Sequence, residues 1–201
     1  MLRRTAGIAL LVLLSAFPAN AHQWVITVGY ANSGSPSLGE GVPSDVFAAG
    51  GGYAFGTRVD LERRYLWFGP EFTLWNNLTG DPLVDYNSSY LQAQFGARIS
   101  ARTRTVPALY GGLGAGYTFS HGENVSRFYE GTKETYGGEF AVGSVHFGAK
   151  TPSRTYGVGL VGELSYHFGL SEPRGRNSVG PARAFLVQIG FVFDIQRSTE
   201  P

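Results

Sequence analysis

Seven ionisable side chains occupy alternate positions within runs of apolar and small residues. The seven are Arg58, Asp60, Glu71, Arg98, Glu163, His167 and Asp194. Alternate positions along a strand point to one face, and charges enclosed on such a face are very unfavourable unless they are paired. We therefore predict an ion-paired network in which four acids face two arginines. His167 is a further side chain that could supply positive charge to it. This network would plug an enclosed space, and the alternative use of the same residues is a narrow channel or a proton-linked gate.

One stretch of the chain carries an acid, a hydroxyl and an imidazole in a row, at Glu163, Ser165 and His167. Residues two apart on a strand are separated by about 6.6 Å. This spacing predicts no direct hydrogen bond between Ser165 and His167 unless the side chains lean together, and it argues against nucleophilic catalysis.

Other chemistry is thinly represented. The chain has no Cys, which excludes a disulfide framework, a thiolate zinc site and a Cys nucleophile. His121, Glu123 and His146 lack metal-ligand spacing, and no helical pattern follows the glycine run 111–116. We predict no catalytic residue, no metal and no cofactor. With 16 Lys and Arg against 15 Asp and Glu, a basic nucleic-acid-binding protein is also excluded.

The segment 120–136 is the most mixed of the polar segments and holds several aromatic residues. Its candidate contact residues are Arg127, Phe128, Tyr129 and Lys133. A solvated loop with no partner is the simpler interpretation of this segment, and a contact surface carried by these residues is the alternative.

These side chains must be positioned by strands, because period-2 alternation runs through the chain after residue 22 and helical periodicity is nearly absent. Eight segments alternate: Trp24–Tyr30, Phe47–Leu61, Leu66–Leu74, Leu91–Ser100, Ala108–Phe119, Gly137–Lys150, Tyr156–Phe168 and Ala184–Ile195. One face is aliphatic and aromatic, and the other holds Gly, Ala, Ser, Gln and isolated charges. In the sixth segment Phe140 and Val142 lie on one parity and Val145 and Phe147 on the other, which a bulge near Gly143 would reconcile.

The segments between these strands are long and short in strict alternation. Long ones hold Asn, Gly, Ser and Pro, and short ones hold basic residues: Arg63, Arg64, Arg102, Arg104, Lys150 and Arg154. This alternation is typical of barrels with short periplasmic turns and long outer loops, whereas a β-sandwich has no reason to sort its loops. The sequence predicts an all-β protein, an eight-stranded antiparallel up-and-down transmembrane β-barrel. The small face, including much of the 29 Gly, would line its narrow interior.

The N-terminus reads as a targeting signal. Arg3 and Arg4 precede an apolar run of about eleven residues, and Ala19-Asn20-Ala21 matches a cleavage site. We predict a signal peptide over residues 1–21 and the barrel over 22–201. The apolar run is too short for a membrane anchor, which needs about twenty residues.

The signal sequence, the eight strands, the Gly-rich face and the final strand Phe185–Phe193 together resemble the small bacterial outer-membrane β-barrel family, the OmpA/OmpX-type barrel domain. The resemblance covers essentially the whole chain after residue 21. It implies location in the cell outer membrane, a structural or adhesive role through the outer loops, and contact with membrane lipid and lipopolysaccharide, with host or matrix molecules as further partners. Members usually end on a terminal aromatic residue, whereas eight residues follow Phe193 here.

Two other functions stay open at this stage, although we predict no enzyme. Lipid A 3-O-deacylases are also eight-stranded and carry a His-x-Ser-Asn run, which His167-Phe168-Gly169-Leu170 resembles in place. Gly169 stands where that family needs its Ser, and parity directs His167 inward. A soluble, lipocalin-like carrier is the other alternative. The oligomeric state is not determined by the sequence.

Overall fold

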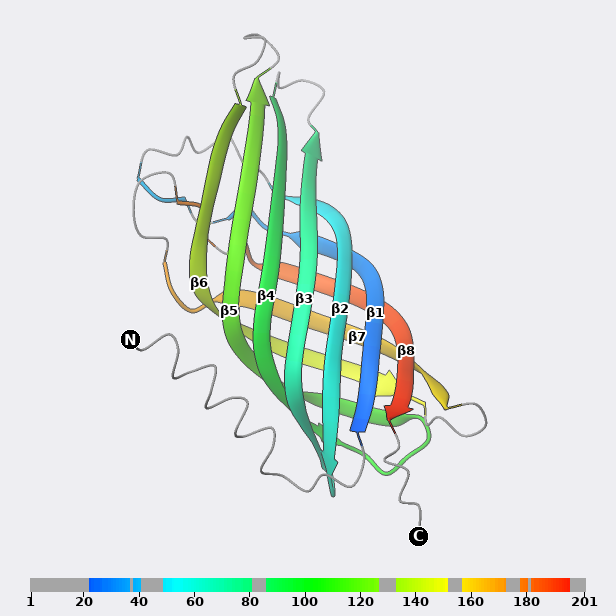
Figure 1. Cartoon of the computed structure of the whole chain (residues 1–201). Coiled ribbons are helices and arrows are strands. Elements are labelled where there is room, and N and C mark those ends of the chain that lie inside the picture. Colours follow the sequence, from blue (N-terminus) through cyan, green and yellow to red (C-terminus); the bar gives the residue numbers. More distant parts are fainter. Residues whose placement is uncertain are drawn as a thin grey trace.

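The eight predicted strands form a closed antiparallel barrel in the computed structural model (Figure 1). The structure describes residues 22–36, 38–40, 49–80, 86–126, 133–151, 157–172, 178–180 and 182–195. The strands are β1 (His22–Ser33), β2 (Gly50–Arg63), β3 (Leu66–Gly80), β4 (Tyr86–Arg102), β5 (Ala108–Ser126), β6 (Lys133–Lys150), β7 (Val158–Gly169) and β8 (Ala184–Ile195). Each pairs with its neighbours in chain order, and β1 closes the ring against β8. The predicted fold class is confirmed. The predicted signal peptide lies outside the described residues.

Four strands extend further than the alternation predicts. The polar segment 120–136 is largely strand, because β5 continues to Ser126 and β6 begins at Lys133. β3 and β4 are likewise paired out to Gly80 and Asn87. Figure 1 shows β3 to β6 rising well above the other strands at the end that carries the long connections. The alternation in the sequence stops before the strands do, because the extensions carry polar residues on both faces. Strands that stand outside lipid tolerate such a composition.

No bulge interrupts β6, which corrects the prediction at Gly143. Gly143 pairs with Ala115 of β5 and with Phe168 of β7 in an unbroken register. Phe140 and Val142 point inward and are buried, while the next apolar residues along β6 point outward. The strand therefore keeps the same face inward along its length. Phe140 and Val142 differ from Val145 and Phe147 because they are apolar residues that point into the upper lumen.

The outer wall is apolar and exposed. Ile189 is 68% exposed, Leu113 61% and Phe147 58%, and large apolar residues with comparable exposure occur on every strand from β1 to β8. In the barrel the backbone groups of adjacent strands pair with one another, which a strand inside hydrocarbon requires. No helix long and apolar enough to cross a membrane occurs in the described part of the chain.

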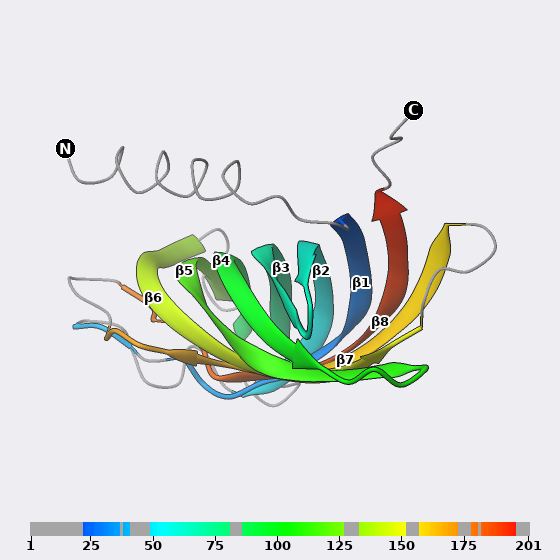
Figure 2. The same ribbon diagram turned by 90° about the horizontal axis from the view of Figure 1, so that it is seen from below.

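The inner face is small and tightly packed. A Cβ added at Gly190 would overlap the carbonyl oxygen of Ile26 on β1, and one added at Gly29 would overlap that of Val187 on β8. Glycine at such positions lets neighbouring strands curve closely around a narrow interior. Figure 2 views the strands from below and shows their curvature around the enclosed space.

Candidate functional site

Glu163 is the centre of a buried ion-pair cluster in the lower half of the lumen. Its Oε1 and Oε2 accept hydrogen bonds from Arg98 Nη1 and Nη2 at 2.9 and 3.0 Å, a two-pronged contact. Arg58 Nη1 lies 3.1 Å from Oε2, and the Tyr110 hydroxyl donates to the same oxygen at 2.6 Å. β2, β4, β5 and β7 each supply one of these side chains, so the cluster links non-adjacent walls of the barrel.

Asp60 holds the lower end of this cluster. It accepts from Arg58 Nε at 3.2 Å and from Lys150 Nζ at 2.9 Å. The Lys150 ammonium also donates to Gln23 Oε1 at 2.6 Å and lies 3.5 Å from the centre of the Trp67 ring. The placement of Lys150 in a short turn is therefore wrong: it is the last residue of β6, points inward and is 3% exposed.

The remaining acids divide between the cluster and the barrel's lower end. Glu71 Oε2 lies 3.5 Å from Arg98 Nη1 and belongs to the cluster. Asp194 is not brought to the arginines; it accepts a hydrogen bond from Gln23 Nε2 at 2.7 Å. With Lys150 added and Asp194 set apart, the buried cluster balances three cations against three carboxylates. Such balance is what burial of charge requires.

His167 lies in the lumen above the cluster and pairs with no charge among the described residues. Its Nδ1 lies 2.8 Å from Gln94 Oε1, so Nδ1 carries the proton and donates it. Its Nε2 is then the acceptor for the Ser165 hydroxyl at 3.0 Å. Ser165 and His167 meet through the exception that the strand spacing allows, because the two side chains lean together. Glu163 is turned away to the arginines, so the row does not act as an acid–imidazole–hydroxyl unit.

Several lumenal residues were missed by the sequence reasoning. Tyr110, Trp67, Trp75 and His146 are all buried there, with His146 Nε2 2.7 Å from Ser100 Oγ. Parity carried this information: Tyr110 shares its face with Gly112, and Trp67 shares its face with Glu71. These aromatic rings lie on the same inward face as the charged residues and occupy the space between them.

The upper mouth of the lumen is covered by two connecting segments. Leu38, between β1 and β2, bridges to Val179, between β7 and β8. The Tyr90 hydroxyl of β4 donates to Gly180 O at 2.6 Å, and Ser120 Oγ of β5 donates to Val179 O at 2.5 Å. Val179 is buried against Tyr90, Tyr136 and Ala182. This outer cap, residues 38 and 178–182 where described, lies at the end opposite the ion-pair cluster.

The loop candidates lie mostly outside the described residues. Arg127, Phe128 and Tyr129 fall there, and Lys133 is described only as the first residue of β6, paired with Val125. Within the described ranges, no group of three or more His, Asp or Glu side chains is placed to hold a metal ion.

Comparison with known proteins identifies the fold. Neither a family model nor a curated sequence matches the chain. Among solved structures, Neisserial surface protein A is similar over 86% of this chain and 96% of its own, at 15% identity and a TM-score of 0.57. A major outer membrane protein of Thermus thermophilus is similar over 87% and 99%, at 11% identity and a TM-score of 0.56. The chain has the fold of the small outer-membrane β-barrels. In this barrel the large apolar residues of the wall face outward and the clustered charges of the lumen face inward, the reverse of a soluble carrier.

Proposed function

We propose that this protein is an outer-membrane barrel with a closed lumen, and that it acts structurally or adhesively through its outer loops. The observation that carries the proposal is that buried side chains contact one another across both halves of the interior. The Arg58–Glu163–Arg98 cluster fills the lower half, and the outer cap around Val179 covers the upper mouth. A role at the surface then falls to the segments outside the membrane.

The cluster is suited to block ions and solutes. Its charges satisfy one another, and Trp67, Tyr110 and Lys150 pack into the remaining space, with Trp67 and Tyr110 in edge contact at 5.4 Å. Eight-stranded barrels are just wide enough for side chains to fill them. A conducting path would require buried pairs to separate, and breaking a buried pair is strongly unfavourable.

Conductance in planar bilayers tests the closed lumen. We expect no stable open level for the refolded full-length protein. A matched pair of variants sharpens the measurement: Glu163→Ala removes the centre of the cluster and should produce brief openings, whereas Glu172→Ala, at an exposed outer position, should not. A stable, large conductance of the unmodified protein would overturn the closed-lumen proposal.

The surface role assigns contacts to Arg127, Phe128, Tyr129 and Lys133, with lipopolysaccharide, host or matrix molecules as partners. Long, mixed outer loops and the extended β5 and β6 that carry them support this proposal. Replacing residues 127–133 with a Gly/Ser segment of equal length should abolish binding to immobilised lipopolysaccharide or matrix proteins while the barrel still migrates as a folded, heat-modifiable band. Binding that survives the replacement would exclude this loop.

We propose no enzymatic step. His167, the residue that a lipid A 3-O-deacylase would use, is buried in the lumen and bonded to Gln94 and Ser165. Mass spectrometry of lipid A from cells that express the protein should show unchanged acylation, and loss of the 3-O acyl chain would contradict this. Protease shaving of intact cells tests the outer-membrane location, since cleavage should occur only in the long loops.

A further inference from the structure

Two of the short turns at the lower end of the barrel are joined into one basic surface. They connect β2 to β3 and β4 to β5. Arg102 N–H donates to Tyr65 O at 2.9 Å, and Arg102 Nη2 donates to Arg64 O at 3.2 Å. The Arg102 side chain also pairs with Glu62. These contacts hold Arg63, Arg64, Arg102 and Arg104 together, a group that we name the basic rim.

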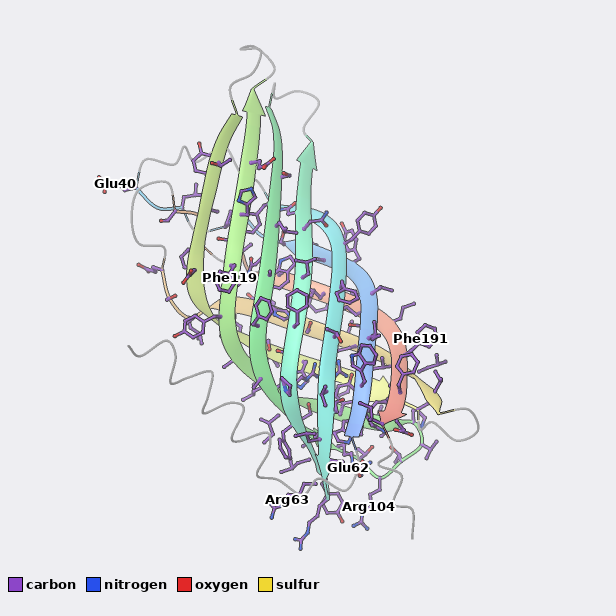
Figure 3. All side chains as sticks on the ribbon, in the orientation of Figure 1. Glu40, Glu62, Arg63, Arg104, Phe119 and Phe191 are labelled. Atoms are coloured by element: carbon purple, nitrogen blue, oxygen red, sulfur yellow. The ribbon has the colours of Figure 1, made fainter. Side chains whose placement is uncertain are left out.

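The basic rim carries excess positive charge. Glu62 is paired with Arg102, whose guanidinium lies 5.1 Å from the centre of the Trp67 ring. Arg63 and Arg64 are exposed and have no ion-pair partner among the described residues. Arg104 is exposed as well and stacks over Tyr65, 4.4 Å from the ring centre. Figure 3 shows Arg63 and Arg104 projecting from the lower end of the barrel, beyond the strands.

The rim stands at the depth of lipid headgroups. Leu66 and Leu109, the first outward-facing apolar residues above it, are 40% and 43% exposed on the wall that faces hydrocarbon. Tyr65 lies in the turn between β2 and β3, and Arg63 and Arg104 project from the same end of the barrel. Moving down the wall, the order is apolar, aromatic, cationic, which matches the order of hydrocarbon, interface and phosphate in a leaflet.

We propose that the basic rim binds the phosphate groups of anionic phospholipids in the periplasmic leaflet. This inference rests on the outer-membrane location in the proposed function. Guanidinium groups suit the task because their planar forks match phosphate oxygens in two-pronged contacts. Clustered arginines at a membrane surface attract anionic lipid and are screened by salt. The stacking of Arg104 on Tyr65 and the Arg102 contacts preorganise the rim, so binding orders few side chains.

Spin-labelled lipids in vesicles test the proposal. The full-length protein is reconstituted in phosphatidylcholine, and electron paramagnetic resonance gives the relative association constants of labelled phosphatidylglycerol and labelled phosphatidylcholine. We expect the unmodified protein to prefer phosphatidylglycerol several-fold at low salt. The preference should fall toward parity near 1 M salt, where the Debye length is about 3 Å.

The decisive variant is Arg63→Gln/Arg64→Gln/Arg104→Gln, which keeps Arg102 and its contacts between the turns. Its preference should fall to near parity, because each arginine near the surface contributes to the attraction of anionic lipid. Arg183→Gln, at the opposite end of the barrel, is the matched control and should keep the full preference. If the triple variant folds poorly, Arg63→Gln alone should still lower the preference. Unchanged selectivity in the variants, or none in the unmodified protein, would overturn the proposal. Neither result depends on lumen conductance or loop binding. A failure of the lipid-binding proposal would therefore leave the proposed closed lumen and the proposed loop contacts to be decided by their own tests.

Discussion

Lys150 Nζ lies 2.9 Å from Asp60 Oδ2, although 90 positions separate the two residues and their strands are not neighbours in the barrel. Their contact spans the lumen from β6 to β2 near its lower end. Together with Arg58 on the other side of Asp60, it converts an apparent surplus of acid into a balanced cluster.

A double-mutant cycle on this pair should reveal strong coupling. Lys150→Met leaves Asp60 with one cation fewer, and Asp60→Asn leaves Lys150 buried with an unbalanced charge. Each should lower the free energy of unfolding by about 3–5 kcal/mol. The double variant should lose less than the sum, by about 0.5–3 kcal/mol. Urea unfolding of the reconstituted barrel measures all three, and strict additivity would show that the pair is not coupled.

Glu163→Gln should be among the most damaging single changes in the lumen. The carboxylate serves two arginines and the Tyr110 hydroxyl, and an amide cannot balance either charge. We expect a loss of about 3–5 kcal/mol in unfolding free energy, because two buried arginines each lose one of their two carboxylate partners. Glu172→Gln, at an exposed outer position, should change it by less than about 0.5 kcal/mol. Equal effects of the two substitutions would contradict the central role of Glu163.

The architecture was predictable for two reasons. The alternation of apolar and small residues indicates which face of a strand each residue occupies, and the alternation of long and short connections indicates an up-and-down barrel. Pairing was less predictable. Lys150 stands where the sixth predicted strand meets a short turn that begins with a Thr-Pro pair, so the pattern alone does not decide its direction; in the structure the strand carries it inward. Phe140 and Val142 are exceptions to the apolar-out rule, since both are buried inside the lumen, where Phe140 lies beside Thr118 of β5.

Side-chain direction explains two other outcomes. Ser165 and His167 meet because both lean toward one another across the two-residue spacing, which Cα positions alone do not reveal. Asp194 has inward parity, yet it stands at the strand end and contacts Gln23, out of reach of the arginines. Parity therefore predicts which face a residue occupies, while its depth along the barrel decides which partners it meets.

Glycine at the inner face should be required where strands approach most closely. Gly190→Ala would place a methyl group against the Ile26 carbonyl of β1, so backbone must shift. We expect a loss of about 1–3 kcal/mol, as for other overpacked sites. Gly162→Ala is the control, since nothing lies within 4 Å of its added Cβ. The folded fraction on heat-modifiable gels and the urea midpoint should fall for the first variant only; a matching fall in both would contradict the close-approach argument.

The outer cap should loosen when its hydroxyl anchor is removed. Tyr90→Phe deletes the donor to Gly180 O but keeps the ring against Val179 and Ala182. Loss of one buried hydrogen bond is worth about 0.5–1.5 kcal/mol. Hydrogen exchange and limited proteolysis at residues 178–182 should therefore accelerate, while the strands stay protected. Tyr117→Phe, on the exposed wall, should leave the cap unchanged. Equal protection of the cap in both variants would show that this hydroxyl does not hold it.

The outward-facing apolar wall makes the sharpest distinction between a membrane-spanning barrel and a soluble one. Ile189 is 68% exposed and pairs with Val28 on β1 and Gly162 on β7, away from either end of β8. Ile189→Arg should cost about 2–4 kcal/mol in lipid, because an arginine at the middle of the hydrocarbon must be desolvated or must distort the bilayer. Denaturant titration in phospholipid vesicles measures this.

The matched control for Ile189→Arg is Leu170→Arg. Leu170 is 60% exposed, but it follows the last residue of β7 at the end of the barrel that carries the long connections, so the substitution should cost no more than about 1 kcal/mol. Equal, small effects at both positions in vesicles would place Ile189 in water and overturn the assignment of this wall to lipid.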